Sequence, residues 1–272
     1  MGKIISFINQ KGGVGKTTTC VNLATFLAAY GKKVLIIDLD PQGNATTGVG
    51  IDKTKDINTF YDIILDECSI KDAIVETGIV NLSILPSNVD LAGSEVILVQ
   101  RENREKVLKN VINTIKDDYD YIAIDCPPSL GLLTVNALTA TDTIIIPIQC
   151  EFYALEGLSQ LMNTVKLVKE YLNNSIEIEG VVLTMKDNRS NLVNQVAKEI
   201  KSFFGRKVYE TVIPRNVRLA EAPSHGIPII LYDNKSTGSI AYQNLAEEFL
   251  KRNKDNGKLM DIKKLLKENK DV

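Results

Sequence analysis

The chain has 272 residues, 44% of them apolar and 24% charged, and its formal net charge is −2. This length suits one large α/β domain or two small ones, with a core of ordinary size for a globular protein. There is no run of about 18 apolar residues, which excludes a membrane-spanning helix, and no overall basic charge that would by itself indicate nucleic-acid binding.

The four cysteines do not form a metal-binding or redox pattern. They lie at positions 20, 68, 126 and 150, no two of them are spaced as CxxC, and the chain has a single histidine. Neither a zinc site nor a paired redox site is therefore indicated. Free thiols are typical of a reducing compartment, so we expect a cytoplasmic protein.

Short apolar runs rich in β-branched residues alternate with helix-length segments. The runs that we predict as buried strands are 4–8, 34–37, 82–85, 121–124, 143–147 and 178–183. The predicted helices are 15–30, 103–117, 131–139, 154–172 and 191–204. This alternation predicts an α/β fold with a mainly parallel, twisted sheet and helices on both faces. Ligands of such folds bind beyond the carboxyl ends of the strands.

A glycine-rich run, KGGVGKTT at positions 11–18, connects the first predicted strand to the first predicted helix. Glycines let a phosphate approach the main chain, whose N–H groups at a helix start attract anions. Lys16 is expected to face the β- and γ-phosphates, Thr17 to bind Mg²⁺, and Thr18 to contact the α-phosphate. The residues that we expect to hold the nucleotide here are Lys11, Gly12, Gly13, Val14, Gly15, Lys16, Thr17 and Thr18.

This loop departs from the common GxxxxGK[ST] pattern, because Gln10 stands at the first glycine and Lys11 is added. In this it resembles the deviant Walker A motif of the ParA/Soj partitioning ATPases, within the wider group that includes MinD and the nitrogenase iron protein. The resemblance implies a P-loop NTPase fold, ATP and Mg²⁺ as ligands, and catalytic roles for Lys11 and Lys16. It also implies an ATP-dependent homodimer in which Lys11 reaches the phosphates of the opposite subunit.

Two carboxylates follow the second strand, in the run DLDPQGN at positions 38–44. Residues two apart at a strand end point the same way, so Asp38 and Asp40 can face one metal–phosphate centre. The run resembles the first switch segment of ParA/Soj proteins. By that match Asp40 is catalytic and orients the attacking water, and Asp38 binds Mg²⁺ through water. Solvated acids in a turn are the alternative.

The strand at 121–124 is followed by Asp125 and then by the stiff turn Pro127-Pro128-Ser129. An acid at the end of an apolar strand is the Walker B arrangement, so we expect Asp125 to bind Mg²⁺. The turn resembles the second switch of the family, which senses the γ-phosphate. An aspartate that only caps the next helix is the alternative.

Two later loops, at 185–189 and 213–216, are expected by resemblance to flank the adenine. Met185 and Pro214 are the predicted packing surfaces for the base. Asp187 and Asn188 are equally compatible with helix-cap positions.

The segment 236–252 is predicted to be the last helix of a domain spanning 1–252, with an apolar side made of Ile240, Leu245, Phe249 and Leu250. The composition then changes to lysine, asparagine and aspartate, which predicts a charged tail over 253–272. A short amphipathic helix near 259–267 and disorder are both open. We expect the tail to be dispensable for ATP hydrolysis and DNA binding.

Three functions are compatible with such an ATPase: DNA partition, MinD-like membrane cycling, and a metabolic role in electron transfer or metal insertion. The absence of paired cysteines weakens the third, and a short tail without aromatic residues weakens the second. The resemblance to Soj runs from Lys3 to about Arg252 and includes IPRNVRLAEAPSHG at 213–226. It favours a chromosome- or plasmid-partitioning ATPase, with the MinD-like ATPase as the alternative.

By the same match, the ATP-bound dimer binds double-stranded DNA without sequence preference, and a ParB-type protein stimulates hydrolysis and release. The implied DNA contacts are Arg189 and Arg218, with Lys235 and Lys251 as weaker candidates and ordinary surface salt bridges as the alternative. Arginine suits phosphate because its planar fork donates two hydrogen bonds. Such a protein would be associated with the nucleoid, and its intrinsic turnover is expected to be slow because no arginine finger is recognisable.

Overall fold

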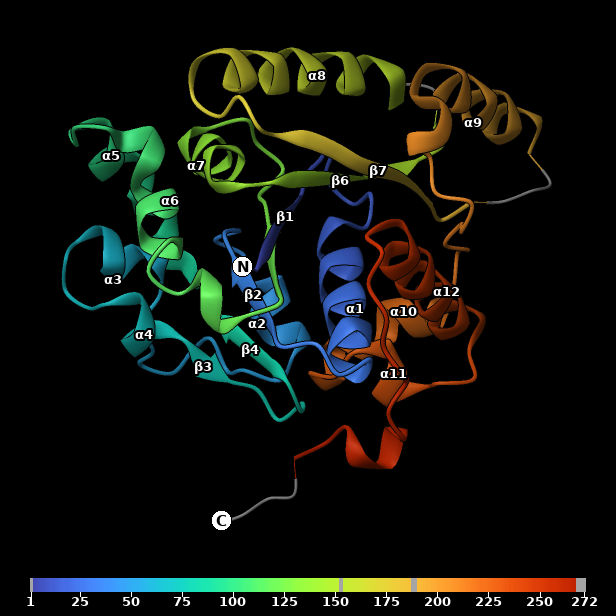
Figure 1. Cartoon of the computed structure of the whole chain (residues 1–272), viewed down its shortest axis with the longest axis horizontal. Helices are drawn as coiled ribbons and strands as arrows, with labels where there is room; N and C mark the ends of the chain where they lie inside the picture. Colours follow the sequence, from blue (N-terminus) through green and yellow to red (C-terminus); the bar gives the residue numbers. More distant parts are fainter. Residues whose placement is uncertain (1, 152–153, 187–189, 268–272) are drawn as a thin grey trace.

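In the computed structural model, which describes residues 2–151, 154–186 and 190–267, seven strands form one sheet in the order β3-β4-β2-β5-β1-β6-β7 (Figure 1). Neighbouring strands run parallel except β3 and β4, which are antiparallel. The strands are β1 (Lys3–Phe7), β2 (Val34–Asp38), β3 (Val75–Glu76), β4 (Leu82–Leu85), β5 (Tyr121–Asp125), β6 (Thr143–Gln149) and β7 (Glu177–Thr184).

The mainly parallel sheet and all six predicted strands are confirmed. The strand that the sequence did not reveal is β3, which has only two residues and pairs with β4 at the sheet edge. Val75 is half-buried and Glu76 is exposed, so this strand lacks the continuous apolar run by which the central strands are recognised.

Helices cover both faces of the sheet, because alternate residues of each strand point to opposite sides. In β2, Val34 and Ile36 pack with one helical layer, whereas Leu35 and Ile37 pack with the other. The first layer contains α1 (Lys16–Ala29), α2 (Asn44–Gly48), α10 (Val217–Glu221), α11 (Ile229–Tyr232) and α12 (Thr237–Arg252). The second contains α3 (Phe60–Ile64), α4 (Ile70–Ala73), α5 (Ser94–Val99), α6 (Val107–Ile112), α7 (Leu132–Ala140), α8 (Ala154–Tyr171) and α9 (Asn191–Phe204).

The predicted helix at 103–117 is broken, which corrects the sequence-based expectation. Short 3-10 turns at Arg104–Lys106 and Lys116–Asp118 flank the six-residue α6. The buried side chain of Asn136, on α7, accepts a hydrogen bond from Leu108 N (3.1 Å) and donates one to the Arg104 carbonyl (2.8 Å). Backbone groups at the start of this segment are thus satisfied by a neighbouring helix, which removes the need for one continuous helix.

The last helix, α12, matches its prediction in extent but not in every buried residue. Leu245, Phe249 and Leu250 are buried, whereas Ile240 is 48% exposed. The buried side of α12 also includes Ala241 and Tyr242, and the Tyr242 hydroxyl lies 3.1 Å from the Thr19 hydroxyl on α1. Ile240 lies outside this buried side.

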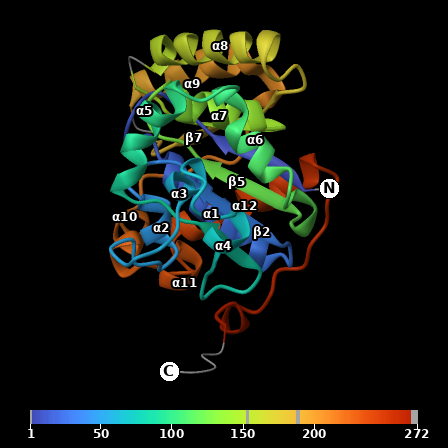
Figure 2. The same cartoon turned by 90° about the vertical axis from the view of Figure 1, so that its left-hand side faces the viewer.

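The segment 253–267 runs along the main body of the protein, and its helical turn lies at the end opposite α8 in both views (Figure 1, Figure 2). Leu265 is fully buried, and its carbonyl accepts a hydrogen bond from Val80 N at 2.8 Å. Met260 N donates to the Ala29 carbonyl at 2.8 Å, and Asp255 accepts from the Tyr121 hydroxyl at 2.7 Å. The helical turn in this segment is a 3-10 helix, Ile262–Lys264. The division of the chain at residue 252 stays a prediction.

Candidate active site

The glycine-rich loop joins β1 to α1 at the carboxyl end of the sheet. Gly13 and Gly15 adopt left-handed conformations, with φ of 72° and 87°, that other residues rarely adopt. A methyl group added at Gly12 or Gly13 would meet no atom within 4 Å, so a ligand can reach the main chain there. The Thr184 hydroxyl donates to the Val14 carbonyl at 2.7 Å and ties the loop to β7.

The two lysines of the loop have different surroundings. Lys16 is only 6% exposed, and its ammonium donates to the Lys11 carbonyl at 3.0 Å. Burial lowers the pKa of Lys16, and the nearby Asp125 carboxylate partly opposes that shift. Lys11 is more open, and its ammonium forms an ion pair with Glu151, in the loop after β6. Glu151 was not predicted from the sequence, because nothing in its neighbourhood marks it as a partner of a residue 140 positions away.

The predicted carboxylates meet at the ends of β2 and β5. These strands are neighbours, and their register places Asp38 beside Asp125. Asp38 is fully buried and accepts hydrogen bonds from Thr46 N (2.9 Å), the Thr46 hydroxyl (2.8 Å) and Asp40 N (3.1 Å). Burial nevertheless raises the pKa of Asp38 to about 6, and the bonds from Thr46 only partly offset it. Thr46, in α2, was not predicted as a partner of Asp38, because nothing in the sequence marks a threonine as the donor to a carboxylate eight residues earlier.

Asp125 is a buried carboxylate without a hydrogen-bond partner among the described residues. Burial, and after it repulsion from Asp38, raises the pKa of Asp125 well above the usual range. The nearby Thr17 hydroxyl lowers this pKa only in part, and it does not form a hydrogen bond with the carboxylate. A divalent cation would remove both penalties. Magnesium is held by one or two carboxylates together with phosphate oxygens and water, which fits this arrangement of Asp125, Asp38 and Thr17.

A cavity of about 610 Å³ opens over the loop, within the size range of small-molecule sites. Of the predicted site residues, it is lined by Gly12, Gly13, Gly15, Lys16, Thr17, Thr18, Asp40, Met185 and Pro214. Lys11, Val14, Asp38 and Asp125 do not line it; Val14 is buried behind the loop, and Asp38 and Asp125 lie beneath it. Thr184 and Tyr242 also line the cavity, and the sequence did not single them out. The remaining wall residues lie in runs that the sequence did indicate, and they are Gln42, Asn44, Pro128, Ile213, Arg215, Asn216, Val217, Leu219 and Ala220.

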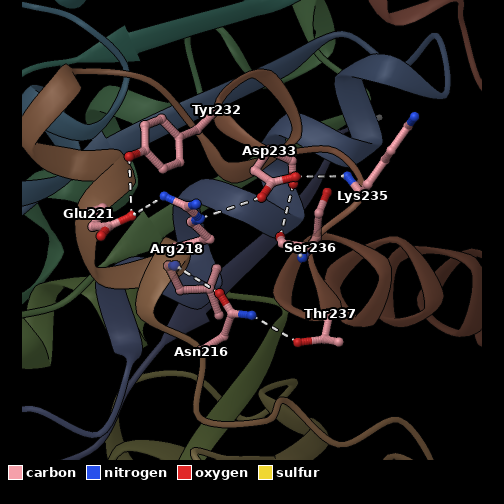
Figure 3. A network of polar contacts seen from close by, with 10 residues as sticks. Asn216, Arg218, Glu221, Tyr232, Asp233, Lys235, Ser236 and Thr237 are labelled. Atoms are coloured by element: carbon pink, nitrogen blue, oxygen red, sulfur yellow. Dashed lines mark hydrogen bonds and ion pairs between the residues drawn. The ribbon is translucent and has the colours of Figure 1, made fainter.

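The predicted DNA-binding residues do not gather at one place in the described part of the chain. Arg218 on α10 forms ion pairs with Glu221 (2.9 Å) and Asp233 (3.6 Å), near the start of α12 (Figure 3). Lys235 lies beside this network, whereas Lys251 lies at the far end of α12, about 24 Å away along a 16-residue helix. Arg189 lies outside the described residues.

Known proteins match this chain over most of its length. The profile of the AAA domain family matches residues 2–178. The sporulation initiation inhibitor protein Soj of Bacillus subtilis is 59% identical over 248 residues, which cover 91% of this chain and 98% of Soj. The chromosome partitioning protein ParA of Caulobacter vibrioides is 51% identical over 255 residues, 93% of this chain and 96% of ParA. The chain belongs to the Soj/ParA family of chromosome-partitioning ATPases.

Solved structures agree with the P-loop fold of this Soj/ParA protein. Cobyrinic acid a,c-diamide synthase from Mycobacterium smegmatis, crystallised with an ATP analog and magnesium, superposes with a TM-score of 0.82 at 34% identity, over 96% of this chain and 98% of that one. In the described part of this Soj/ParA protein, no helix is long and apolar enough to cross a membrane.

Replacing Asp125 with asparagine is expected to stabilise the nucleotide-free protein at pH 8 by about 1–3 kcal/mol. Folding raises the pKa of Asp125, so the folded state holds more protons than the unfolded state once the pH exceeds the ordinary value of 3.8. Wild-type stability therefore falls relative to the variant as pH rises through the folded pKa. Urea unfolding between pH 4 and pH 8 measures the difference. Mg²⁺ with nucleotide should stabilise the wild type alone. If the stability of the variant relative to the wild type does not increase with pH, the raised pKa of Asp125 is contradicted.

Proposed function

We propose that this protein is a DNA-partitioning switch. ATP with Mg²⁺ binds in the cavity over the glycine-rich loop, two copies close over the nucleotide, and the pair binds double-stranded DNA without sequence preference. A ParB-type partner then stimulates hydrolysis and release. The observation that supports this most directly is the pairing of Asp38 with Asp125 beneath a loop that begins a helix and carries an added lysine.

Each residue of the site has a physical task in this proposal. Lys16 and the N–H groups at the start of α1 hold the phosphates, and burial keeps the ammonium of Lys16 at a fixed position. Thr17 and Asp125 hold the metal, and Asp38 binds its water ligands. Asp40 orients the attacking water. Its carboxylate is suited to this task because a hydrogen bond from Gln42 N, at 3.0 Å, holds it in place. Bound Mg²⁺ neutralises charge on the phosphate oxygens.

The far wall of the cavity is suited to a purine base. Met185 has a left-handed backbone, with φ of 50°, and the adjacent Lys186 forms a β-bridge with Pro214. The two loops are thereby held side by side, and they offer apolar surface at the cavity. We assign Met185 and Pro214 to the adenine, opposite the phosphate loop.

Lys11 supports the pairing of two copies. It does not line the cavity of its own chain, and its side chain is 38% exposed and bound only by Glu151 among the described residues. A cation outside its own nucleotide site is available to a second site brought against it. In the proposal, Lys11 exchanges Glu151 for the phosphates of the second copy.

The MinD-like alternative is less well supported. Membrane cycling needs an amphipathic segment with a free apolar side. In the segment 253–267, Leu265 is fully buried, and Leu259 and Ile262 pack against the protein's own core. These apolar side chains are already used within the chain, which favours DNA over a lipid surface as the binding partner.

Co-sedimentation with random-sequence DNA tests the proposal. Binding is expected with ATP, and to be at least tenfold weaker with ADP or without nucleotide, because closure of two copies doubles the number of phosphate contacts. Over a salt series the logarithm of the binding constant should fall linearly with the logarithm of salt concentration. Arg218→Glu should abolish binding. Binding that ignores nucleotide, or that is insensitive to salt, would refute the proposal.

A further inference from the structure

The guanidinium of Arg218 is held by two acids of its own chain (Figure 3). Its Nη1 lies 2.9 Å from Glu221 Oε2, and its Nε lies 3.6 Å from Asp233 Oδ2. The Tyr232 hydroxyl donates to the same Glu221 oxygen at 3.1 Å, and the ring of His225 stacks on Tyr232 at 4.9 Å. Two carboxylates thus share one guanidinium, and Glu221 is fixed in place by a second donor.

The helix that carries Arg218 is also a wall of the nucleotide cavity. Val217, Leu219 and Ala220 of α10 line that cavity, whereas Arg218 and Glu221 belong to the polar network outside it. Asn216 caps α10 by accepting from Leu219 N at 3.3 Å, and its amide donates to the Thr237 hydroxyl at 2.8 Å, in the first turn of α12. The helix that carries Arg218 is therefore joined at its start to α12, and it forms part of the cavity wall.

We infer that Glu221 and Asp233 form an internal counter-charge that competes with DNA phosphates for Arg218, and so sets the DNA affinity of the protein. This inference rests on the proposed function. The side chains of Arg218, Glu221 and Asp233 are 53%, 39% and 35% exposed, so water screens the pairs and they can be exchanged. A phosphate offers the same two-pronged acceptor geometry as a carboxylate. DNA binding at Arg218 must then displace these acids, and removing them should make binding tighter.

A mutant cycle tests the counter-charge. Glu221→Gln and Asp233→Asn are each expected to tighten binding of a fluorescent random-sequence duplex, with ATP, by about three- to tenfold. Each removes one negative charge, so Glu170→Gln serves as a control: Glu170 is exposed on α8 and has no partner among the described residues. In an Arg218→Ala background, Glu221→Gln should tighten DNA binding by no more than the Glu170→Gln control does. Tyr232→Phe, which loosens Glu221 without changing the net charge, should give a smaller gain.

The outcomes separate the inference from the proposed function. A gain from Glu221→Gln that equals the Glu170→Gln gain, or that persists without Arg218, overturns the counter-charge while leaving DNA binding in place. If the wild type binds no DNA in any nucleotide state, the proposed function fails. Binding that then appears only in the Glu221→Gln, Asp233→Asn double variant would still support the counter-charge, and no binding in either protein would overturn both. Thermal melts check that each variant is folded.

Discussion

Replacing Asp40 with alanine is expected to slow ATP hydrolysis by about a hundredfold or more while ATP binding is kept, because a positioned acid or base contributes roughly 10²- to 10⁴-fold. Asp40 lines the cavity beside Lys16 and is 8% exposed. Its carboxylate is fixed by Gln42 N, and its carbonyl accepts from the Ser87 hydroxyl at 2.9 Å. This rigid placement is what the orientation of an attacking water requires.

Phosphate release gives the turnover of the Asp40→Ala variant, and calorimetry with ATP gives its affinity. Asp56→Ala is the matched control, because Asp56 is an exposed aspartate of the nearby loop with no partner among the described residues. In the proposed cycle hydrolysis ends the closed state, so the Asp40→Ala protein should sediment as a long-lived dimer in ATP. Turnover near that of the Asp56 control would remove Asp40 from the catalytic site.

Truncation after Arg252 is expected to lower the free energy of unfolding by about 3–5 kcal/mol, on the basis of the apolar burial that is lost. For a chain of this size, that corresponds to a fall in Tm of about 10 °C. The truncation removes buried Leu265, the partly buried Leu259 and Ile262, and the 2.5 Å ion pair of Asp255 with Lys32. The expectation that the tail is dispensable concerned ATP hydrolysis and DNA binding, not folding stability, and it stays a prediction.

The control ends the chain after Lys267, which leaves every described contact of the segment in place and should melt like the full chain. Leu265→Ala should account for about 2–4 kcal/mol of the loss, since a buried leucine is cut back in the core. Calorimetric melts of the four proteins measure this. If the chain ending at Arg252 melts at the wild-type temperature, the packing of 253–267 contributes nothing to stability.

The sequence by itself determined where the central strands lie along the chain and where the phosphate loop lies. Continuous β-branched runs are recognisable locally because both faces of a parallel sheet are buried, so β1 and β5 needed no tertiary information. The loop at 11–18 was also recognisable from the sequence, since its glycines, Lys16 and Thr17 are close together in the chain. The acids at the carboxyl ends of β2 and β5 were found for a related reason: parallel strands end at the same edge, where ligands bind.

Only the tertiary structure decided which side chains meet across that edge. The register of β2 against β5 pairs Asp38 with Asp125, and their shared burial raises both pKa values. The ion pair of Lys11 with Glu151 also joins positions far apart in the chain.

The contacts of the C-terminal segment and of α10 were likewise decided only by the tertiary structure. The burial of Leu265 and the two acids on Arg218 came only from the fold, and the sequence read both regions by composition or resemblance. A residue pattern states which side of an element is buried or charged. It does not state which distant element covers that side, because that choice is made by the packing of the whole chain.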